Sequence, residues 1–168
     1  MSELLEIVKS KLEEKFGNNL LASEMHYDFP VFILNKSVTK EVLEFLKNEK
    51  ELQFHFLTTM CGIHHPENPE DKEFALMYQL HNMPKNWRIR IKTYMPKSDM
   101  DMPTITDLWK TANWMERQEY DFFGFNFVGH PNLTRILNMD EMNYFPLRKE
   151  YPLEDLMRED KNDKMFGR

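Results

Sequence analysis

The sequence predicts an α+β fold with a mainly antiparallel sheet, helices packed on one face of it, and an extended C-terminal segment. Three observations support this prediction. The chain of 168 residues is long enough for one domain with a sizeable core. Its periodic segments follow the order helix, strand, helix, three strands and helix, which suggests an α+β domain. Beyond Gly124 the regular periodicity fades and prolines recur at positions 131, 146 and 152.

The first two helices are predicted at 3–16 and 40–49. In the first, apolar residues recur at every fourth position, at Leu4, Val8, Leu12 and Phe16, as they do on one face of a helix. The run Gly17-Asn18-Asn19 is expected to end it. In the second helix we expect Thr39 to cap the N-terminus and three apolar residues to point inward, namely Val42, Leu43 and Leu46.

Four strands are predicted, at 22–34, 53–63, 74–81 and 87–94. The first contains Pro30, so we expect it at an edge of the sheet. The last gives the clearest signal, because Ile89, Ile91 and Thr93 alternate with Arg88, Arg90 and Lys92. The turn-forming residues 82–86 separate the last two strands, which are therefore expected to form a hairpin.

A third helix is predicted to follow the loop 96–103. Thr106 and Asp107 can begin it, and it is expected to run to about Phe122. We divide the chain into an α+β domain, residues 1–125, and an extended C-terminal segment with a charged tail, residues 126–168. The tail is expected to be extended, with its last dozen residues disordered when the chain is alone.

Composition excludes several functions. Cys61 is the one cysteine, so the chain can form no internal disulfide and no cysteine-ligated cluster. Its 5 glycines make no phosphate-binding loop. A net charge of −6 argues against nucleic-acid binding, and the three cations of the strand 87–94 are expected to form one solvated or docking face. Without a secretory signal or a run of about 20 apolar residues, the chain is expected in the cytoplasm, reaching a membrane only through a partner.

A group of cysteine and histidine residues resembles half of a metal site. Its members are Cys61, His64 and His65, with His55 and His81 nearby in sequence. The period of the strand argues against a site, because Cys61 and Ile63 share one strand face while the two adjacent histidines lie at the strand exit. We favour a buried structural cysteine with histidines in a turn.

The third helix combines charges with many aromatic residues. On it, Arg117 and Asp121 are spaced to pair, whereas Glu116 and Glu119 are spaced to repel each other. Three interpretations are open: a carboxylate pair for a metal or for acid–base catalysis, an acidic surface for a basic partner, and a solvated helix face. The density of aromatic residues around it favours burial by a partner.

Two prolines bracket the segment Leu147–Tyr151 and impose an extended backbone there. Arg148 and Lys149, next to Tyr151, are residue types found at interfaces. This strap needs a surface to lie on, which is either a partner or the chain's own domain.

Three ordered blocks in the C-terminal half carry a family resemblance. They are Glu116-Arg-Gln-Glu-Tyr-Asp-Phe-Phe-Gly124, His130-Pro-Asn-Leu133 with Arg135-Ile-Leu137, and Pro146-Leu-Arg-Lys-Glu-Tyr-Pro-Leu153. In order and spacing they resemble the C-type subunit, also called the 30 kDa-type subunit, of the proton-translocating NADH–quinone oxidoreductase, respiratory complex I. Upstream, the runs 57–62, 78–82 and 88–92 also look like this family. Two residues depart from its usual pattern, Gln118 in place of a glutamate and Thr134 in place of a basic residue.

The resemblance implies a non-redox structural subunit of the peripheral arm. Electrons from NADH would pass through FMN and iron–sulfur clusters in other subunits to quinone, coupled to proton translocation, while this chain binds no cofactor. Its partner would be the large quinone-site subunit of the D type, on the cytoplasmic side of the inner membrane. The matching motifs assign partner contacts to Glu116, Arg117, Asp121, His130, Arg135, Arg148, Lys149 and Tyr151. The alternatives are the equivalent subunit of an energy-converting hydrogenase and a free-standing Cys/His metal-dependent enzyme.

Overall fold

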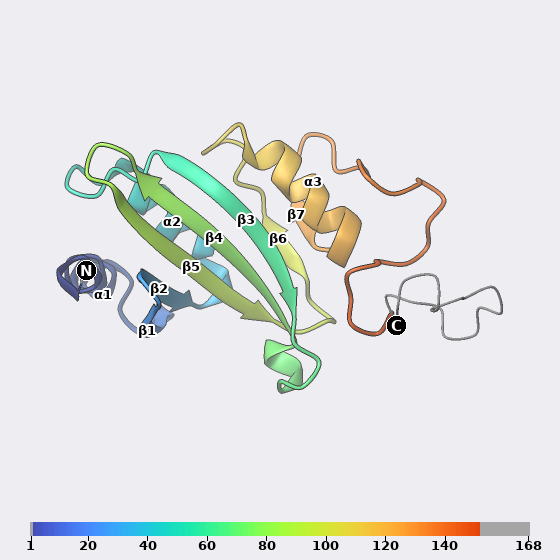
Figure 1. The fold of residues 1–168 in the computed structure, drawn as a ribbon, viewed down its shortest axis with the longest axis horizontal. Coiled ribbons are helices and arrows are strands. Elements are labelled where there is room, and N and C mark those ends of the chain that lie inside the picture. Colours follow the sequence, from blue (N-terminus) through green and yellow to red (C-terminus); the bar gives the residue numbers. More distant parts are fainter. Residues whose placement is uncertain (1, 152–168) are drawn as a thin grey trace, which may run out of the picture.

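A computed structural model of the chain describes residues 2–151, which form a twisted sheet with helices against it (Figure 1). The helices are α1 (Ser2–Phe16), α2 (Thr39–Asn48) and α3 (Ala112–Phe123). The strands are β1 (Leu20–His26), β2 (Phe29–Leu34), β3 (Phe56–His64), β4 (Phe74–Asn82), β5 (Trp87–Met95), β6 (Asp101–Pro103) and β7 (Asn126–Val128). The prediction of a disordered end concerns residues outside the described part.

The main sheet has five strands in the order β1-β2-β5-β4-β3. All of its neighbouring strands are antiparallel except β2 and β5, which are parallel. The predicted hairpin is present, with Tyr78 opposite Ile91 and Asn82 opposite Trp87. The predicted α+β fold with a mainly antiparallel sheet is therefore confirmed.

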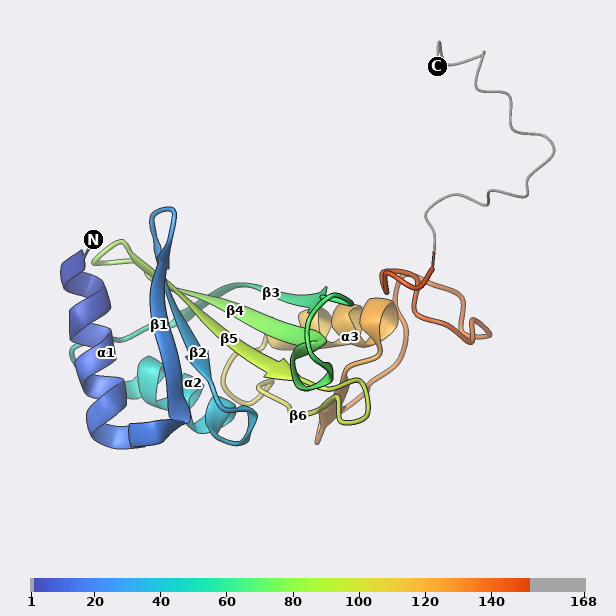
Figure 2. The same cartoon turned by 90° about the horizontal axis from the view of Figure 1, so that it is seen from below.

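One face of the sheet carries the core. In β4 and β5 the alternation places Tyr78 and Ile91 on this face, where both are fully buried. The same core contains Val8 of α1, Val42 of α2 and Phe123 of α3. Figure 2 shows the other side of β3, β4 and β5 without an α-helix among the described residues. The prediction that helices pack on one face is confirmed.

The predicted strand 22–34 is wrong, because it is a hairpin of β1 and β2. His26 pairs with Phe29, so the turn consists of Tyr27 and Asp28. Tyr27 has a φ of 53°, a conformation for which glycine or asparagine is the usual sequence signal. The edge position expected for the strand with Pro30 is also wrong, because Pro30 lies near the start of β2, between β1 and β5, and only β1 is at the edge.

Two further boundaries differ from the prediction. Helix α3 begins at Ala112 rather than at Thr106, because turns at Ile105 and Trp109 precede it. Strand β6 lies in the segment predicted as a loop and pairs with β7.

The predicted cap of α2 is wrong, because the Thr39 hydroxyl donates to the carbonyl of Asn35 instead. Among residues 2–151, no helix is long and apolar enough to cross a bilayer.

Candidate partner interface

The C-terminal segment, residues 126–151 as far as it is described, follows α3 and passes along it (Figure 1). Most of the residues that the sequence assigns to a partner interface lie on α3 or on this segment. They are brought together in space, and the contacts below show what each side chain binds.

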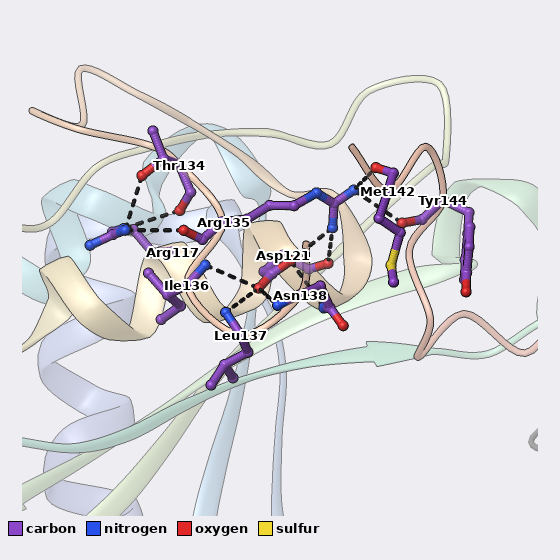
Figure 3. A network of polar contacts seen from close by, with 9 residues as sticks. All are labelled: Arg117, Asp121, Thr134, Arg135, Ile136, Leu137, Asn138, Met142 and Tyr144. Carbon is purple, nitrogen blue, oxygen red and sulfur yellow. Dashed lines mark hydrogen bonds and ion pairs between the residues drawn. The ribbon is translucent and has the colours of Figure 1, made fainter. Parts of the chain in front are cut away.

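Asp121 of α3 organises the middle of the segment (Figure 3). Its buried carboxylate accepts hydrogen bonds from the backbone N–H groups of Ile136, Leu137 and Asn138 at 3.1, 2.8 and 3.0 Å. It also forms an ion pair with Arg135 at 2.7 Å. Burial raises the pKa of Asp121, but the hydrogen bonds from Asn138, Leu137 and Arg135 outweigh it and hold this pKa well below its ordinary value.

Two arginines complete this network (Figure 3). Arg135 donates to the carbonyl oxygens of Met142 and Tyr144 at 2.8 and 3.1 Å. Arg117 donates to the carbonyl oxygen and the hydroxyl of Thr134 at 3.0 and 2.9 Å. The predicted pairing of Arg117 with Asp121 along the helix is wrong, because Asp121 turns to Arg135 and Arg117 to the segment. Both cations therefore fix the backbone path of an irregular segment.

Glu116 and Glu119 are buried on the core side of α3. Glu116 accepts hydrogen bonds from the Thr104 hydroxyl at 2.6 Å and from the Ile105 N–H at 2.7 Å. Glu119 accepts one from the Gly62 N–H at 2.5 Å. Burial raises the pKa of each carboxyl to about 7, because water no longer solvates the charged form. The structure supports neither a solvated face nor an exposed acidic surface for these two residues.

His130 is held within the same region. Its Nδ1 accepts from the Asn132 N–H at 3.0 Å, so Nε2 donates to the Asn113 carbonyl at 3.1 Å. Its ring also lies 4.0 Å from the Glu116 carboxylate. His130 therefore ties the start of the C-terminal segment to the first turn of α3.

The described part of the strap, residues 146–151, lies on its own domain. Arg148 donates to the Phe123 carbonyl at 2.7 Å, and its guanidinium lies 4.5 Å from the centre of the Phe145 ring. The Lys149 N–H donates to Nδ1 of the buried His64 at 2.8 Å, whose Nε2 contacts Glu73 at 3.1 Å. Lys149 and Tyr151 themselves are exposed. Of the strap residues predicted to contact a partner, Arg148 therefore binds its own chain with its side chain.

Gly124 lets the strap approach the end of α3. It has a φ of 83°, and an added Cβ would lie 2.6 Å from the Arg148 guanidinium and from the Phe145 ring. We expect Gly124→Ala to lower the free energy of unfolding by roughly 2 kcal/mol, from the strained backbone and the displaced strap. Urea denaturation checks this, with Gly17→Ala as control, since its φ is also positive but nothing lies within 4 Å of its Cβ. Equal losses for the two variants would contradict a specific contact with the strap.

Apolar side chains of the C-terminal segment point into solvent. Leu137 is 62 % exposed and Met139 70 %, and Tyr144 and Leu147 are also exposed. Sequence reasoning missed them because they follow no helical or strand period. The available signal was the presence of large apolar residues in a stretch without periodicity.

The cysteine and histidine group does not form a metal site. Among residues 2–151 there is no group of three or more His, Cys, Asp or Glu side chains arranged to hold a metal. Cys61 and His64 lie on opposite faces of β3, three residues apart, and both ring nitrogens of His64 already have partners. The predicted buried cysteine is wrong, because Cys61 is half-buried and is not part of the core, and His64 lies at the end of β3 rather than in a turn.

The fold and these contacts together indicate to which class of protein the chain belongs. Charged side chains bind the chain's own backbone and hold an irregular segment whose apolar side chains face outward. Large apolar contact surfaces are characteristic of permanent complexes. This is the architecture of a subunit that contributes surfaces to a larger assembly.

Comparison with known proteins gives the particular family. The family model described as "Respiratory-chain NADH dehydrogenase, 30 Kd subunit" matches residues 32–156. A C-type subunit of the NADH-quinone oxidoreductase of Rhizobium etli is 36 % identical over 146 residues, covering 86 % of this chain and 76 % of the relative. The C-type subunit of Citrifermentans bemidjiense is 37 % identical over 149 residues, covering 89 % and 90 %. The chain belongs to the 30 kDa subunit family, that is, the C-type subunits of NADH–quinone oxidoreductase, as its motifs predicted.

Solved structures agree with this assignment. The trypsin-resistant fragment (1-134) of Nqo5 has a TM-score of 0.64 and 30 % identity, covering 75 % of this chain and 98 % of the fragment. A chain of the membrane-bound sulfane sulfur reductase, an archaeal respiratory membrane complex, has a TM-score of 0.71 and 25 % identity, covering 88 % and 85 %. The fold is thus shared with a related respiratory complex, while the sequence relatives favour NADH–quinone oxidoreductase over the hydrogenase alternative.

Proposed function

We propose that this chain is a non-redox structural subunit of the peripheral arm, which holds neighbouring subunits in the geometry that electron transfer from NADH to quinone needs. The observation that carries this proposal is the network around Asp121. It uses a buried carboxylate and two arginines to fix an irregular segment, and the segment presents apolar side chains outward. FMN, iron–sulfur clusters and quinone would then belong to partner subunits.

The proposed partner is the large quinone-site subunit of the D type. A relative in Acinetobacter baumannii, named as a joint C/D subunit of NADH-quinone oxidoreductase, is 35 % identical over 149 residues, which are 86 % of this chain and 25 % of the relative. A fusion of the two subunits in one chain supports their association in this protein. We place the subunit peripherally, on the cytoplasmic side of the membrane, as part of the assembly.

The proposed docking surface consists of four exposed apolar side chains of the C-terminal segment, which we call the apolar strip: Leu137, Met139, Tyr144 and Leu147. Exposed apolar side chains on a fixed backbone lose little conformational entropy on binding, so they are efficient contacts. The ring of Tyr151 lies 5.0 Å from that of Tyr144 and extends this surface, and the exposed Lys149 adds a cation close to it in sequence. The buried residues Glu116, Asp121 and His130 would support the surface rather than touch the partner.

We expect the double variant Leu137→Ser/Met139→Ser to reduce incorporation into the complex about tenfold, since a loss of about 0.7 kcal/mol at each of two contact residues weakens binding by that factor. Incorporation is measured as the ratio of this subunit to the others in the purified complex. Met25→Ser/Met83→Ser is the matched control, because Met25 and Met83 are 39 and 61 % exposed but lie far along the chain from the strip. Full incorporation of the first variant, or equal loss in both, would contradict the proposed surface.

Affinity purification of the tagged full chain from its native membrane tests the assembly itself. We expect co-purification of flavin- and iron–sulfur-containing chains with NADH–quinone reductase activity. Recovery of this chain alone under gentle conditions would contradict the proposed function. Recovery with hydrogenase subunits instead would favour the alternative assembly.

A further inference from the structure

The side of the sheet opposite the core is a second extended surface, which we call the outer face. Strand register places the following side chains on it: Val31 and Ile33 of β2, Arg88, Arg90 and Lys92 of β5, Ala75, Met77 and Gln79 of β4, and Cys61 and Ile63 of β3. The buried members Val31 and Ala75 are absent from the residues that form the core cluster. Within residues 2–151, no α-helix lies over β3, β4 and β5 on this side (Figure 2), and the short 3-10 helix Glu70–Lys72 contacts β5.

The outer face is more apolar than a solvated sheet face. Antiparallel sheets with one side in water usually alternate apolar residues inside with polar residues outside. Here Ile33, Cys61, Ile63 and Met77 point outward and are only half-buried. They form two apolar bands, one on β2 and one on β3 and β4, with the cations of β5 between them.

The cations of β5 lack acidic partners. Arg88, Arg90 and Lys92 form no ion pair with a carboxylate among the described residues. Their alternation spaces them by about 7 Å along one strand. Arg90 lies 4.5 Å from the Phe29 ring and Lys92 4.5 Å from the Tyr94 ring.

Within the described part, some other cations do have acidic partners, while others, such as Lys47, Lys85 and Lys110, form no ion pair. Ion pairs to carboxylates are formed within the described part by Lys9, Lys11, Lys36, Lys40, Lys97, Arg135 and Arg148. The chain has 28 acidic residues. Within the described part, Glu3 and Asp28 line a pocket together with Arg88. No carboxylate there forms an ion pair with Arg90 or Lys92. A row of cations between apolar bands is complementary to a protein surface with carboxylates between apolar side chains.

We propose that the outer face is a second interface, separate from the apolar strip, and that it binds an acidic surface of another subunit in the same assembly. This rests on the proposed function, since it requires an assembly that contains this chain. With two separate interfaces, one on the C-terminal segment and one on the sheet, the chain joins two neighbours rather than attaching to one. The apolar side chains of this face are half-buried in a rigid sheet and do not protrude as those that insert into a membrane do, which favours a protein partner over an anionic membrane surface.

Cys61 is a native probe of this face, because it is the one cysteine of the chain and is half-buried on β3. We expect N-ethylmaleimide to modify Cys61 at least tenfold more slowly in the intact complex than in the purified full chain, measured by mass spectrometry of the Cys61 peptide. Circular dichroism confirms that the purified chain is folded. Equal rates would overturn the proposal, as would protection of the purified chain by phosphatidylglycerol vesicles without protection in the complex.

Charge reversal tests the chemistry of the partner. We expect Arg90→Glu/Lys92→Glu to reduce incorporation into the complex about tenfold at low salt and to restore fast alkylation of Cys61 in the complexes that form. Lys9→Glu/Lys50→Glu changes the net charge equally on other surfaces and is expected to assemble normally. Normal incorporation of Arg90→Glu/Lys92→Glu, with loss only for Leu137→Ser/Met139→Ser, would overturn the second interface and leave the proposed function intact. Failure of the wild-type chain to co-purify with any subunit would instead overturn the proposed function.

Discussion

Asp121→Asn is expected to lower the free energy of unfolding by roughly 3 kcal/mol and to release the C-terminal segment from α3. The substitution removes the negative charge that compensates the largely buried Arg135 and that accepts three backbone N–H bonds. Removing one partner of a buried ion pair typically costs about 3–5 kcal/mol, because the other charge stays buried. Urea denaturation measures the stability, and limited proteolysis measures the exposure of residues 130–145.

Asp140→Asn is the matched control for this prediction, because Asp140 is exposed in the same segment. We expect it to change the free energy of unfolding by less than about 0.5 kcal/mol.

The pKa of Asp121 is lower in the folded chain than in the unfolded chain. The ionised Asp121 therefore contributes its full stabilisation at pH values above its pKa in the unfolded chain. This stabilisation is lost as the pH falls through its pKa in the folded chain. Wild-type stability in Asp121→Asn would show that the segment is held by other contacts.

The second large effect that we expect is a fall in the free energy of unfolding of the wild-type chain as the pH rises from about 5 to 7. Burial raises the pKa of Glu116 and of Glu119 from 4.5 to about 7. Between these values the unfolded chain has released protons that the folded chain still holds, so stability falls with rising pH and levels off above the folded pKa. A shift of this size corresponds to roughly 3 kcal/mol for each carboxyl. Urea denaturation at a series of pH values measures the slope.

The variant Glu119→Gln isolates the contribution of one of these two carboxyls to the pH dependence of stability. Its side-chain oxygen can still accept from the Gly62 N–H, but it carries no charge to bury. We expect the variant to be more stable than the wild type at pH 8 and to lose about half of the slope between pH 5 and 7. Glu14→Gln on the exposed side of α1 should leave the slope unchanged. A wild-type slope in Glu119→Gln would mean that Glu119 is ionised in the folded chain throughout this range.

Local patterns were sufficient for most of the fold. The period of Leu4, Val8 and Leu12 located α1, and the alternation around Ile91 located β5, because both patterns reflect burial on one side of a single element. The missed features depend on distant contacts. Strand β6 exists because β7 pairs with it from 25 residues further along the chain. The turn at Tyr27 uses a backbone conformation that its residue type does not signal.

In the candidate site, too, the sequence located the residues but not the contacts they make with distant parts of the chain. The motif residues around α3 and the strap were located from sequence, and the family was identified from them. The partners of their side chains were not, because the helix spacing of Arg117 and Asp121 suggested a local pair while each binds the C-terminal segment. The exposed strip at Leu137 and Met139 carries no period and became visible only when burial was known.

The sequence by itself determined the fold class and the family, since periodicity and motif spacing can be read along the chain. Only the tertiary structure decided which charges are buried and which face outward. Asp121 pairs with Arg135, 14 positions further along the chain, and β2 and β4 place their half-buried apolar side chains on either side of the β5 cations. Such pairings depend on the path of the chain in space, and this path fixes whether a charged residue supports a surface or forms one.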